Sequence, residues 1–388
     1  MKGGNVSWYE LIQTAIAIRR ELHKIPEPCW KEVATSAFIG KRLDELDISW
    51  RPCAKTGIVA HIAQGQRGDH LALRTDIDGL VLAETATVPW KSTVQGCMHG
   101  CGHDGHMATM LATAEWLKKH EAALPGPVSF LFQPAEEGGY GARAMIADGA
   151  LEGVDRIFGW HNWPNIPFGK AVCPAGPIMA ANASFKIVIK GSGGHASQPE
   201  LCGDPVLAAA ALTLGLQQIV SRRLPPQQAA VVSVTSIDAR SAETVIPDQA
   251  VLAGSVRMET TGDLQLIGEL IKSTSQSIAA GYNAAAEVDF SPRYPAVVND
   301  ATEAGRVQDI LGEVLGNCWL HKETAVPLMA SEDFSYYLEK VPGSFAIAGA
   351  GDGGLFSIPC HNSCYVFNDQ LVEPMVRVMV RLTGVCTK

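Results

Sequence analysis

The chain has 388 residues, of which 47% are hydrophobic and 18% charged, and its net charge is -9. This length predicts two domains or three, and the composition is that of a globular protein, which excludes intrinsic disorder. The excess of acidic residues excludes the basic surface that nucleic acids bind. The sequence has no long apolar run and no signal-peptide layout at its N-terminus, so we expect a cytoplasmic protein with no membrane span and mostly reduced cysteines.

The first 180 residues alternate between helical and extended patterns. Apolar spacing predicts helices over residues 8–23 and about 31–46. The elements expected next are strand 70–74, helix 104–120, strand 128–132, helix 141–148 and strand 156–160. This alternation predicts an α/β fold with a mostly parallel mixed sheet flanked by helices.

The pattern changes near residue 180, where Phe185, Ile187 and Ile189 alternate with polar neighbours, as in a half-buried antiparallel strand. The expected order is then helix 204–221, strands 229–238 and 250–258, helix 263–280 and strand 286–291. Together these form the ferredoxin-like order. We therefore expect an inserted α+β ferredoxin-like domain at residues 181–293, within a catalytic domain formed by residues 1–180 and 294–388. In its second part we expect helices 301–315, 331–340 and 370–383 and strand 345–348.

Four short segments concentrate side chains that bind metals. Residues 98–106 contain three histidines and a cysteine, and thiolate and imidazole donors are typical of transition-metal sites. The neighbouring Glu136 and Glu137 would repel each other unless a cation or a proton intervened. His161 and His361 lie in the other two segments. Because ligands bind at the carboxyl ends of strands in open α/β sheets, we expect these segments to meet there.

The number of donors favours two metal ions. The candidate ligands are Cys101, His103, Glu137, His161 and His361. They exceed one tetrahedral site, and paired ions are typical of hydrolases. Glu136 is left over and is free to take a proton from water. We expect Asp78, just after strand 70–74, to orient a ligand histidine.

Two other patterns suggest different sites. The glycine-rich residues 349–354 match the dinucleotide fingerprint, but the residues after them do not predict the helix that would bind a pyrophosphate. Cys97, Cys101, Cys360 and Cys364 form two pairs at a spacing that a structural zinc site uses. That alternative leaves the paired glutamates unexplained.

Nearly the whole chain resembles the di-metal amidohydrolase and aminoacylase family. This family includes hippurate hydrolase, plant indole-acetyl-amino-acid hydrolases and bacterial N-acetyl-amino-acid deacetylases, with carboxypeptidases as more distant relatives. The matching motifs are residues 20–23, 73–78, 101–106, 132–138, 161–164, 193–196, 246–248, 329–334 and 361–362.

The resemblance implies roles for the candidate residues. Cys101, His103, Glu137, His161 and His361 would hold two divalent ions, which could be zinc, manganese, cobalt or nickel. Glu136 would be the general base.

The resemblance also implies a role for the inserted domain. His195 would bind the substrate carboxylate or stabilise the developing oxyanion, in many relatives from the partner subunit of a dimer, and the inserted domain would form the homodimer or a higher homo-oligomer. Thr244 stands where relatives commonly carry an asparagine that contacts the substrate. Asn162 is a further candidate substrate contact.

The expected reaction is metal-dependent hydrolysis of an N-acyl amino acid, such as an N-acetyl or N-aroyl amino acid, to a carboxylic acid and a free amino acid. Two alternatives stay open. One is a dipeptidase or carboxypeptidase that uses the same site, and the other is a non-catalytic protein that binds amino acids with the help of metals. An unliganded Glu136 beside the ions disfavours the second, since a binding protein has no need of it.

Overall fold

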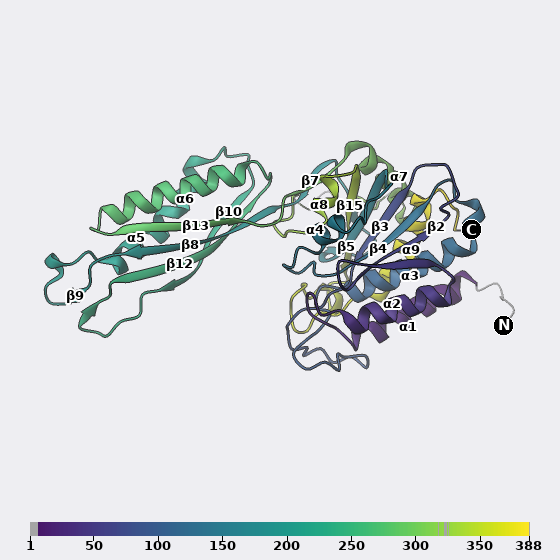
Figure 1. The fold of residues 1–388 in the computed structure, drawn as a ribbon, viewed down its shortest axis with the longest axis horizontal. Helices are drawn as coiled ribbons and strands as arrows, with labels where there is room; N and C mark the ends of the chain where they lie inside the picture. Colours follow the sequence, from purple (N-terminus) through teal and green to yellow (C-terminus); the bar gives the residue numbers. More distant parts are fainter. Residues whose placement is uncertain (1–6, 317, 322–323, 325, 388) are drawn as a thin grey trace. The chain divides into compact units, whose positions relative to one another are not determined.

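The computed structural model describes residues 7–316, 318–321, 324 and 326–387. The chain forms two compact units (Figure 1). The larger unit comprises residues 1–176, 298–325 and 333–388, and the smaller unit comprises residues 177–297 and 326–332.

A seven-stranded mixed sheet forms the centre of the larger unit. In spatial order its strands are β1 (Ser49–Cys53), β2 (Gly57–Ile62), β4 (Val128–Gln133), β3 (Leu71–Asp76), β5 (Arg156–Pro167), β15 (Gly343–Gly351) and β6 (Ala171–Val172). The neighbours β4, β3, β5 and β15 run parallel, and the outer strands join antiparallel. Every residue of β3, β4 and β15 is buried, as expected for parallel strands covered on both faces.

Helices cover this sheet (Figure 1). They are α1 (Trp8–His23), α2 (Val33–Glu45), α3 (His103–Lys119), α4 (Gly141–Ala147), α7 (Ala301–Leu315), α8 (Ser335–Leu338) and α9 (Val372–Leu382), with short 3-10 turns at Glu121–Ala123, Leu355–Ser357 and Asp369–Leu371. A capping box starts α1, in which the Ser7 hydroxyl accepts from the Glu10 amide and the Glu10 carboxylate accepts from the Ser7 amide. α3 packs against α1 and α9 within one apolar core. Among the described residues, we find no helix that combines the length and the apolar character needed to cross a membrane.

The smaller unit contains a four-stranded antiparallel sheet with its own apolar core. The sheet order is β10 (Ala230–Asp238), β12 (Gln249–Met258), β8 (Ala181–Lys190) and β13 (Ala285–Pro292), and α5 (Pro205–Gln218) and α6 (Asp263–Ala280) pack on it. Along the chain this is strand, helix, two strands, helix and strand, the ferredoxin-like arrangement. Shorter elements are β7 (Gly176–Met179), paired with β14 (Val297–Asn299), β9 (Gly194–His195), paired with β11 (Val245–Ile246), a 3-10 turn at Pro199–Leu201 and a π turn at Ile219–Arg223. The predicted fold class is confirmed.

Several details differ from the sequence-based expectations. The helix expected at residues 331–340 is only the short α8, because Asp333 turns its carboxylate inward to accept hydrogen bonds from Arg74 and Gln133. The antiparallel strands β1 and β2 were not assigned from the sequence. Pro52 lies in β1, at the edge of the sheet, where proline is tolerated.

Candidate metal centre

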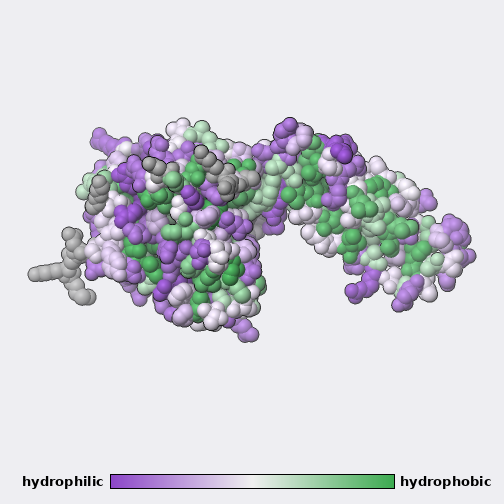
Figure 2. All heavy atoms as spheres, turned by 180° about the vertical axis from the view of Figure 1, so that it is seen from behind, coloured by the Kyte–Doolittle hydropathy of each residue, from purple (hydrophilic) through white to green (hydrophobic). Residues whose placement is uncertain are grey.

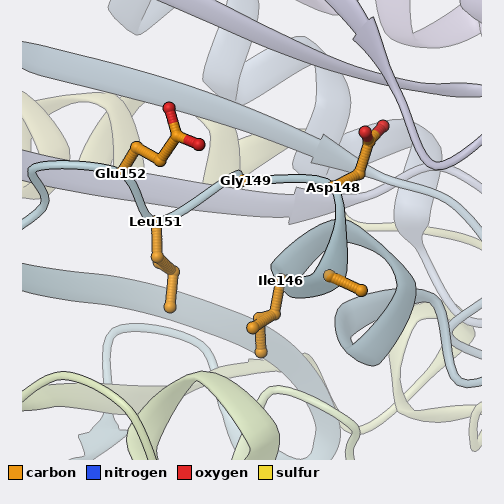
Figure 3. Close-up of a pocket in the computed structure, with 6 residues that line it drawn as sticks. Ile146, Asp148, Gly149, Leu151 and Glu152 are labelled. Carbon is orange, nitrogen blue, oxygen red and sulfur yellow. The ribbon is translucent and has the colours of Figure 1, made fainter.

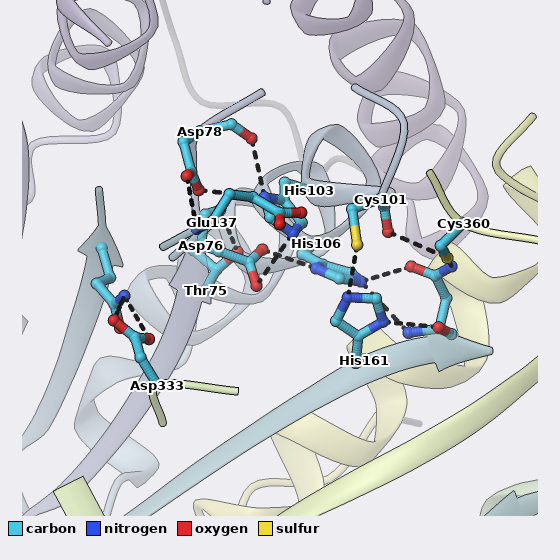
Figure 4. Close-up of polar contacts among 12 residues, drawn as sticks. Thr75, Asp76, Asp78, Cys101, His103, His106, Glu137, His161, Asp333 and Cys360 are labelled. Atoms are coloured by element: carbon cyan, nitrogen blue, oxygen red, sulfur yellow. Dashed lines mark hydrogen bonds and ion pairs between the residues drawn. The ribbon is translucent and has the colours of Figure 1, made fainter. Parts of the chain in front are cut away.

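Four of the predicted metal ligands, Cys101, His103, Glu137 and His161, lie close together at the carboxyl ends of the parallel strands of the larger unit (Figure 4). Donor atoms in each of three groups lie within 4.8 Å of one another. The groups are Cys101, His103 and His161; Cys101, Glu137 and His361; and His103, Glu136 and Glu137. The five predicted ligands and Glu136 are therefore brought together from segments far apart in the sequence.

His103 is the first residue of α3 and is oriented by Asp78. Its Nδ1 lies 2.8 Å from the Asp78 carbonyl oxygen. A carbonyl only accepts, so Nδ1 carries the hydrogen and Nε2 is directed to the other donors. Asp78 also accepts a hydrogen bond from the Glu137 amide through Oδ2, at 3.0 Å. Asp78 therefore contacts two of the candidate ligands.

The loop before α3 brings Cys101 against His161 of β5. The Cys101 Sγ lies 3.3 Å from His161 Nε2. His161 Nδ1 donates to the Asn162 carbonyl at 2.6 Å, which leaves Nε2 to face the cysteine. The loop turns at Gly102, whose φ is 94°, and a Cβ there would lie 2.3 Å from Asn162 Oδ1. Only glycine fits this close approach.

The other side of the centre is formed by Glu137 and His361. Glu137 Oε1 lies 3.0 Å from His361 Nε2. The loop that carries His361 is attached to the loop of Cys101, since the His361 amide donates to the Gly100 carbonyl at 2.8 Å. The His361 side chain is 53% exposed, so this side of the centre is open to solvent.

Negative charge dominates the centre. Burial opposes a charge on His103, but Asp76, Asp78 and Glu137 raise its pKa well above the usual value. Burial and the neighbouring His106 lower the pKa of His161. The carboxylates that favour a positive charge on His103 also favour a bound metal cation, because both are attracted by the same negative charges.

Asp76 and His106 are buried next to the candidate ligands, and the sequence analysis assigned a role to neither of them. Asp76, the last residue of β3, accepts from His106 Nδ1 at 2.8 Å and from Arg74 Nη1 at 3.0 Å. Burial raises the pKa of Asp76, but His103, His106 and Arg74 more than offset this and hold it well below the usual range. The available signal was the spacing of His103 and His106, which places both on one face of a helix.

Arg74 connects Asp76 to the loop that carries Glu136 and Glu137. Its guanidinium donates to Gln133 at 2.8 Å and to Asp333 at 3.0 Å. Gln133 ends β4 and is followed within the next four residues by Glu136 and Glu137. Glu136 is 7% exposed.

The three candidate substrate contacts lie in two places. Asn162 is buried beside the ligands, where Oδ1 accepts from His106 at 2.8 Å and Nδ2 donates to the Tyr365 hydroxyl at 2.8 Å. His195 and Thr244 lie together on the surface of the smaller unit, where the Ala196 amide donates to the Thr244 carbonyl. The His195 Nδ1 accepts from the Ser197 amide at 3.2 Å, so in a neutral ring Nε2 carries the hydrogen. All three roles stay predictions.

The residues fit metal ions. His103 Nε2 is buried and has no hydrogen-bond partner in the part of the chain that the structure describes. A buried polar atom without a partner costs free energy, and a bound cation removes that cost. Imidazole, thiolate and carboxylate donors suit zinc and other transition metals.

The alternative sites receive no support. None of the candidate metal groups among the described residues contains more than one cysteine. After β15, the glycine-rich segment leads only into the 3-10 turn Leu355–Ser357.

A hollow of about 550 Å³ beside α4 is lined by Asp148 and Glu152 with aliphatic residues, and it contains none of the candidate ligands (Figure 3).

Comparison with known proteins identifies the family. The model of Peptidase family M20/M25/M40 matches residues 72–384. N-acetylcysteine deacetylase of Bacillus subtilis (strain 168) is 42% identical over 336 residues, 86% of this chain and 87% of the relative. Hippurate hydrolase of Campylobacter jejuni is 36% identical over 360 residues, 92% of each chain. The crystal structure of the Bacillus subtilis YXEP protein, described as a dinuclear metal-binding M20 peptidase, has a TM-score of 0.83 and 34% identity, and the match covers 97% of this chain and 99% of that chain.

The chain belongs to the Peptidase family M20/M25/M40. The predicted family resemblance and the predicted enzyme class, a metal-dependent hydrolase, are confirmed.

Proposed function

We propose that the chain hydrolyses the amide bond of an N-acyl amino acid, such as an N-acetyl or N-aroyl amino acid, and releases a carboxylic acid and a free amino acid. The names of the deacetylase and hippurate hydrolase relatives support this substrate class. The observation that carries the proposal is the position of Glu136, a carboxylate within 4.8 Å of donor atoms of His103 and Glu137.

Two divalent ions would be held by Cys101, His103, Glu137, His161 and His361. The dinuclear relative supports this assignment, and so does His103 Nε2, which has no hydrogen-bond partner among the described residues. Such ions, when bound, polarise the amide carbonyl and lower the pKa of water to about 7. The donor set accommodates zinc, manganese, cobalt or nickel.

Glu136 would act as general base and then as general acid. Its carboxylate takes a proton from the attacking water and delivers it to the departing amide nitrogen. Asp78 keeps the His103 ring in the tautomer that directs Nε2 to the centre. His195 donates from Nε2 to the developing oxyanion, a contact whose loss typically costs about 100- to 1000-fold in rate. Asn162 and Thr244 are the further proposed substrate contacts.

The smaller unit would act as a lid and as the contact surface of a homodimer. Its helix α5 exposes Val206, Leu207 and Leu214, and apolar residues are spread over the visible face of this unit in Figure 2. We place the enzyme in the cytoplasm, where the free cysteines stay reduced. Light scattering on the purified protein tests the dimer, and a monomer at all concentrations would contradict it.

A dipeptidase is the second candidate, favoured by the description of the family and of the YXEP protein as peptidases. It would use the same ions and the same base. Parallel assays with N-acetyl amino acids, N-benzoyl amino acids and dipeptides separate the two, and faster turnover of dipeptides would replace the first proposal.

The replacement Glu136→Gln tests the mechanism. We expect it to reduce kcat at least about 100-fold, since general acid–base catalysis contributes about 10²–10⁴-fold, and to leave the bound metal unchanged. Mass spectrometry of the metal content and turnover of N-acetyl amino acids with zinc, manganese or cobalt check this. Near-normal turnover would show that Glu136 is not the base. Absence of hydrolysis by the unmodified, metal-loaded protein would favour a binding protein.

A further inference from the structure

The loop that carries Glu136 is held at both ends by an N-terminal segment that contributes no metal ligand. We call residues 135–139 the base loop and residues 29–32 the clamp. At one end of the loop, Glu32 Oε1 accepts a hydrogen bond from the Ala135 amide at 2.9 Å. At the other end, the indole Nε1 of Trp30 donates to the Gly139 carbonyl at 3.1 Å.

Glu32 has an unusual position for a buried carboxylate. It immediately precedes α2, where a capping side chain would normally bind the first amides of the helix, yet it makes no such bond. Glu27 does this instead and accepts from the Ala34 and Thr35 amides at 3.1 and 2.8 Å. The Glu32 carboxylate is thereby left for other partners.

Those partners are donors that hold the clamp and the base loop together. Besides the Ala135 amide, Glu32 accepts from the Trp30 amide at 2.9 Å and from the Thr56 hydroxyl at 2.7 Å. Glu32 is 0% exposed, and a buried carboxylate is stable only when hydrogen bonds replace its water shell. The carboxylate therefore fixes the position of the Ala135 amide.

Ala135 needs such support because of its backbone conformation. Its φ is 55°, in the left-handed region that residues with a Cβ rarely adopt. The Ala135 carbonyl also accepts from the Gly141 amide at 3.1 Å. Since Glu136 is the next residue, the conformation of Ala135 sets the direction in which the Glu136 side chain leaves the backbone.

The far end of the base loop is closely packed on the clamp. A Cβ at Gly139 would lie 2.2 Å from the Cys29 Sγ and 2.9 Å from the Trp30 Nε1. The loop therefore has no room to move toward the clamp. Between its ends, Asp78 holds the Glu137 amide.

We propose that Glu32 and Trp30 are positioning residues for the general base. They act through Ala135 and Gly139 and fix the base loop so that Glu136 faces the reacting water. This inference rests on the proposed function, because it takes Glu136 to be the base.

Three variants test the proposal. Glu32→Gln keeps the shape but removes the negative charge and one of the two acceptor oxygens that bind the Ala135 amide, the Trp30 amide and the Thr56 hydroxyl. Trp30→Phe removes the indole N–H and keeps an aromatic ring. Glu27→Gln is the matched control, because Glu27 binds α2 and does not hydrogen-bond the base loop. Measurements are kcat and KM for an N-acetyl amino acid with saturating manganese, the bound metal, and amide hydrogen exchange of residues 133–141 in the metal-free protein.

We expect Glu32→Gln to lower kcat about 10- to 100-fold, in line with the cost of a small misplacement of a catalytic group. Trp30→Phe should have a smaller effect in the same direction. Hydrogen exchange at residues 133–141 should accelerate in both variants, with KM and bound metal unchanged, and Glu27→Gln should match the unmodified protein. Trp30→Phe removes a single hydrogen-bond donor and is therefore the milder change. If Glu32→Gln does not fold, Trp30→Phe alone still tests the proposal.

A double variant separates this proposal from the proposed function. If the clamp acts through the base, adding Glu32→Gln to Glu136→Gln causes no further loss of kcat. If the two replacements lower kcat independently, so that the losses multiply in the double variant, the proposal is contradicted. It is also contradicted if both clamp variants have normal kcat and normal hydrogen exchange while Glu136→Gln is inactive. High activity of Glu136→Gln alone would instead overturn the assignment of the base, and the positioning role with it.

Discussion

At the scale of single residues, hydrogen bonds to neighbouring groups set the orientation of the candidate ligands. His103 is oriented by the Asp78 carbonyl, and His161 by the Asn162 carbonyl. In metal sites, such partners fix the tautomer and orientation of the imidazole, and their replacement typically costs about 10- to 100-fold in metal affinity. Asp76 contributes at this level through charge, because it lies 3.7 Å from His103 Nε2 and binds His106 and Arg74.

We expect Asp76→Asn to weaken metal binding about 10- to 100-fold, because it removes a negative charge next to His103 without removing a ligand. The melting temperature of the metal-free protein should also fall, since Arg74 and His106 lose a buried charged partner. Competition with a chromophoric chelator measures the affinity. Glu152→Gln, a change of an exposed carboxylate away from the centre, is the control. Unchanged metal affinity in Asp76→Asn would contradict this role.

Residue type and position in the chain predicted which side chains meet at the centre. Cysteine, histidine and glutamate are common metal ligands, and the carboxyl ends of parallel strands meet at one edge of the sheet. Among the supporting residues, the sequence analysis assigned a role only to Asp78, as the residue that orients a ligand histidine. The contacts of Asp76 with His106 and Arg74 were not predicted. The role of Glu32 was also missed, because its partner Ala135 is 103 residues away in the chain.

At the scale of secondary structure elements, a chain of hydrogen bonds crosses the sheet away from the centre. His70 Nδ1 faces the Gly153 carbonyl at 3.0 Å and so carries the hydrogen. Its Nε2 then accepts from the Ser129 hydroxyl at 2.6 Å, and Ser129 accepts from His61 Nδ1 at 2.8 Å. The His70 ring is therefore neutral in this arrangement, and burial lowers the pKa of both histidines.

This chain predicts how stability depends on pH. Because each histidine has a lower pKa in the folded than in the unfolded state, the unfolded state binds more protons as the pH falls below about 6.5, and stability decreases. We expect metal-free protein to lose melting temperature between about pH 7.5 and 5.5, and a His61→Gln, His70→Gln double variant to lose less. An equal loss in both proteins would contradict the assignment.

The central strands were predictable because burial on both faces makes them continuous apolar runs, as in β4 and β15. The edge strand β1, its neighbour β2 and the two-residue strands β9 and β11 were not assigned from the sequence. The shortened helix α8 shows a tertiary contact overriding local propensity, since the buried Asp333 takes hydrogen bonds from distant residues.

At the scale of the whole molecule, two units have separate apolar cores, and the candidate ligands all come from the larger one. The order of elements predicted both folds, because each unit follows a common architecture. The acyl group and the amino acid of the proposed substrate would be selected by the surroundings of the centre, to which segments far apart in the chain contribute.

The central claim is that these five donors hold two ions beside an unliganded Glu136. Anomalous diffraction from crystals loaded with zinc, and separately with manganese, tests it most directly. We predict two anomalous peaks per chain, each about 2.0–2.3 Å from donor atoms of Cys101, His103, Glu137, His161 or His361, with Glu136 outside the coordination distance of both ions. A single ion, ions bound elsewhere, or Glu136 as a ligand would contradict the account.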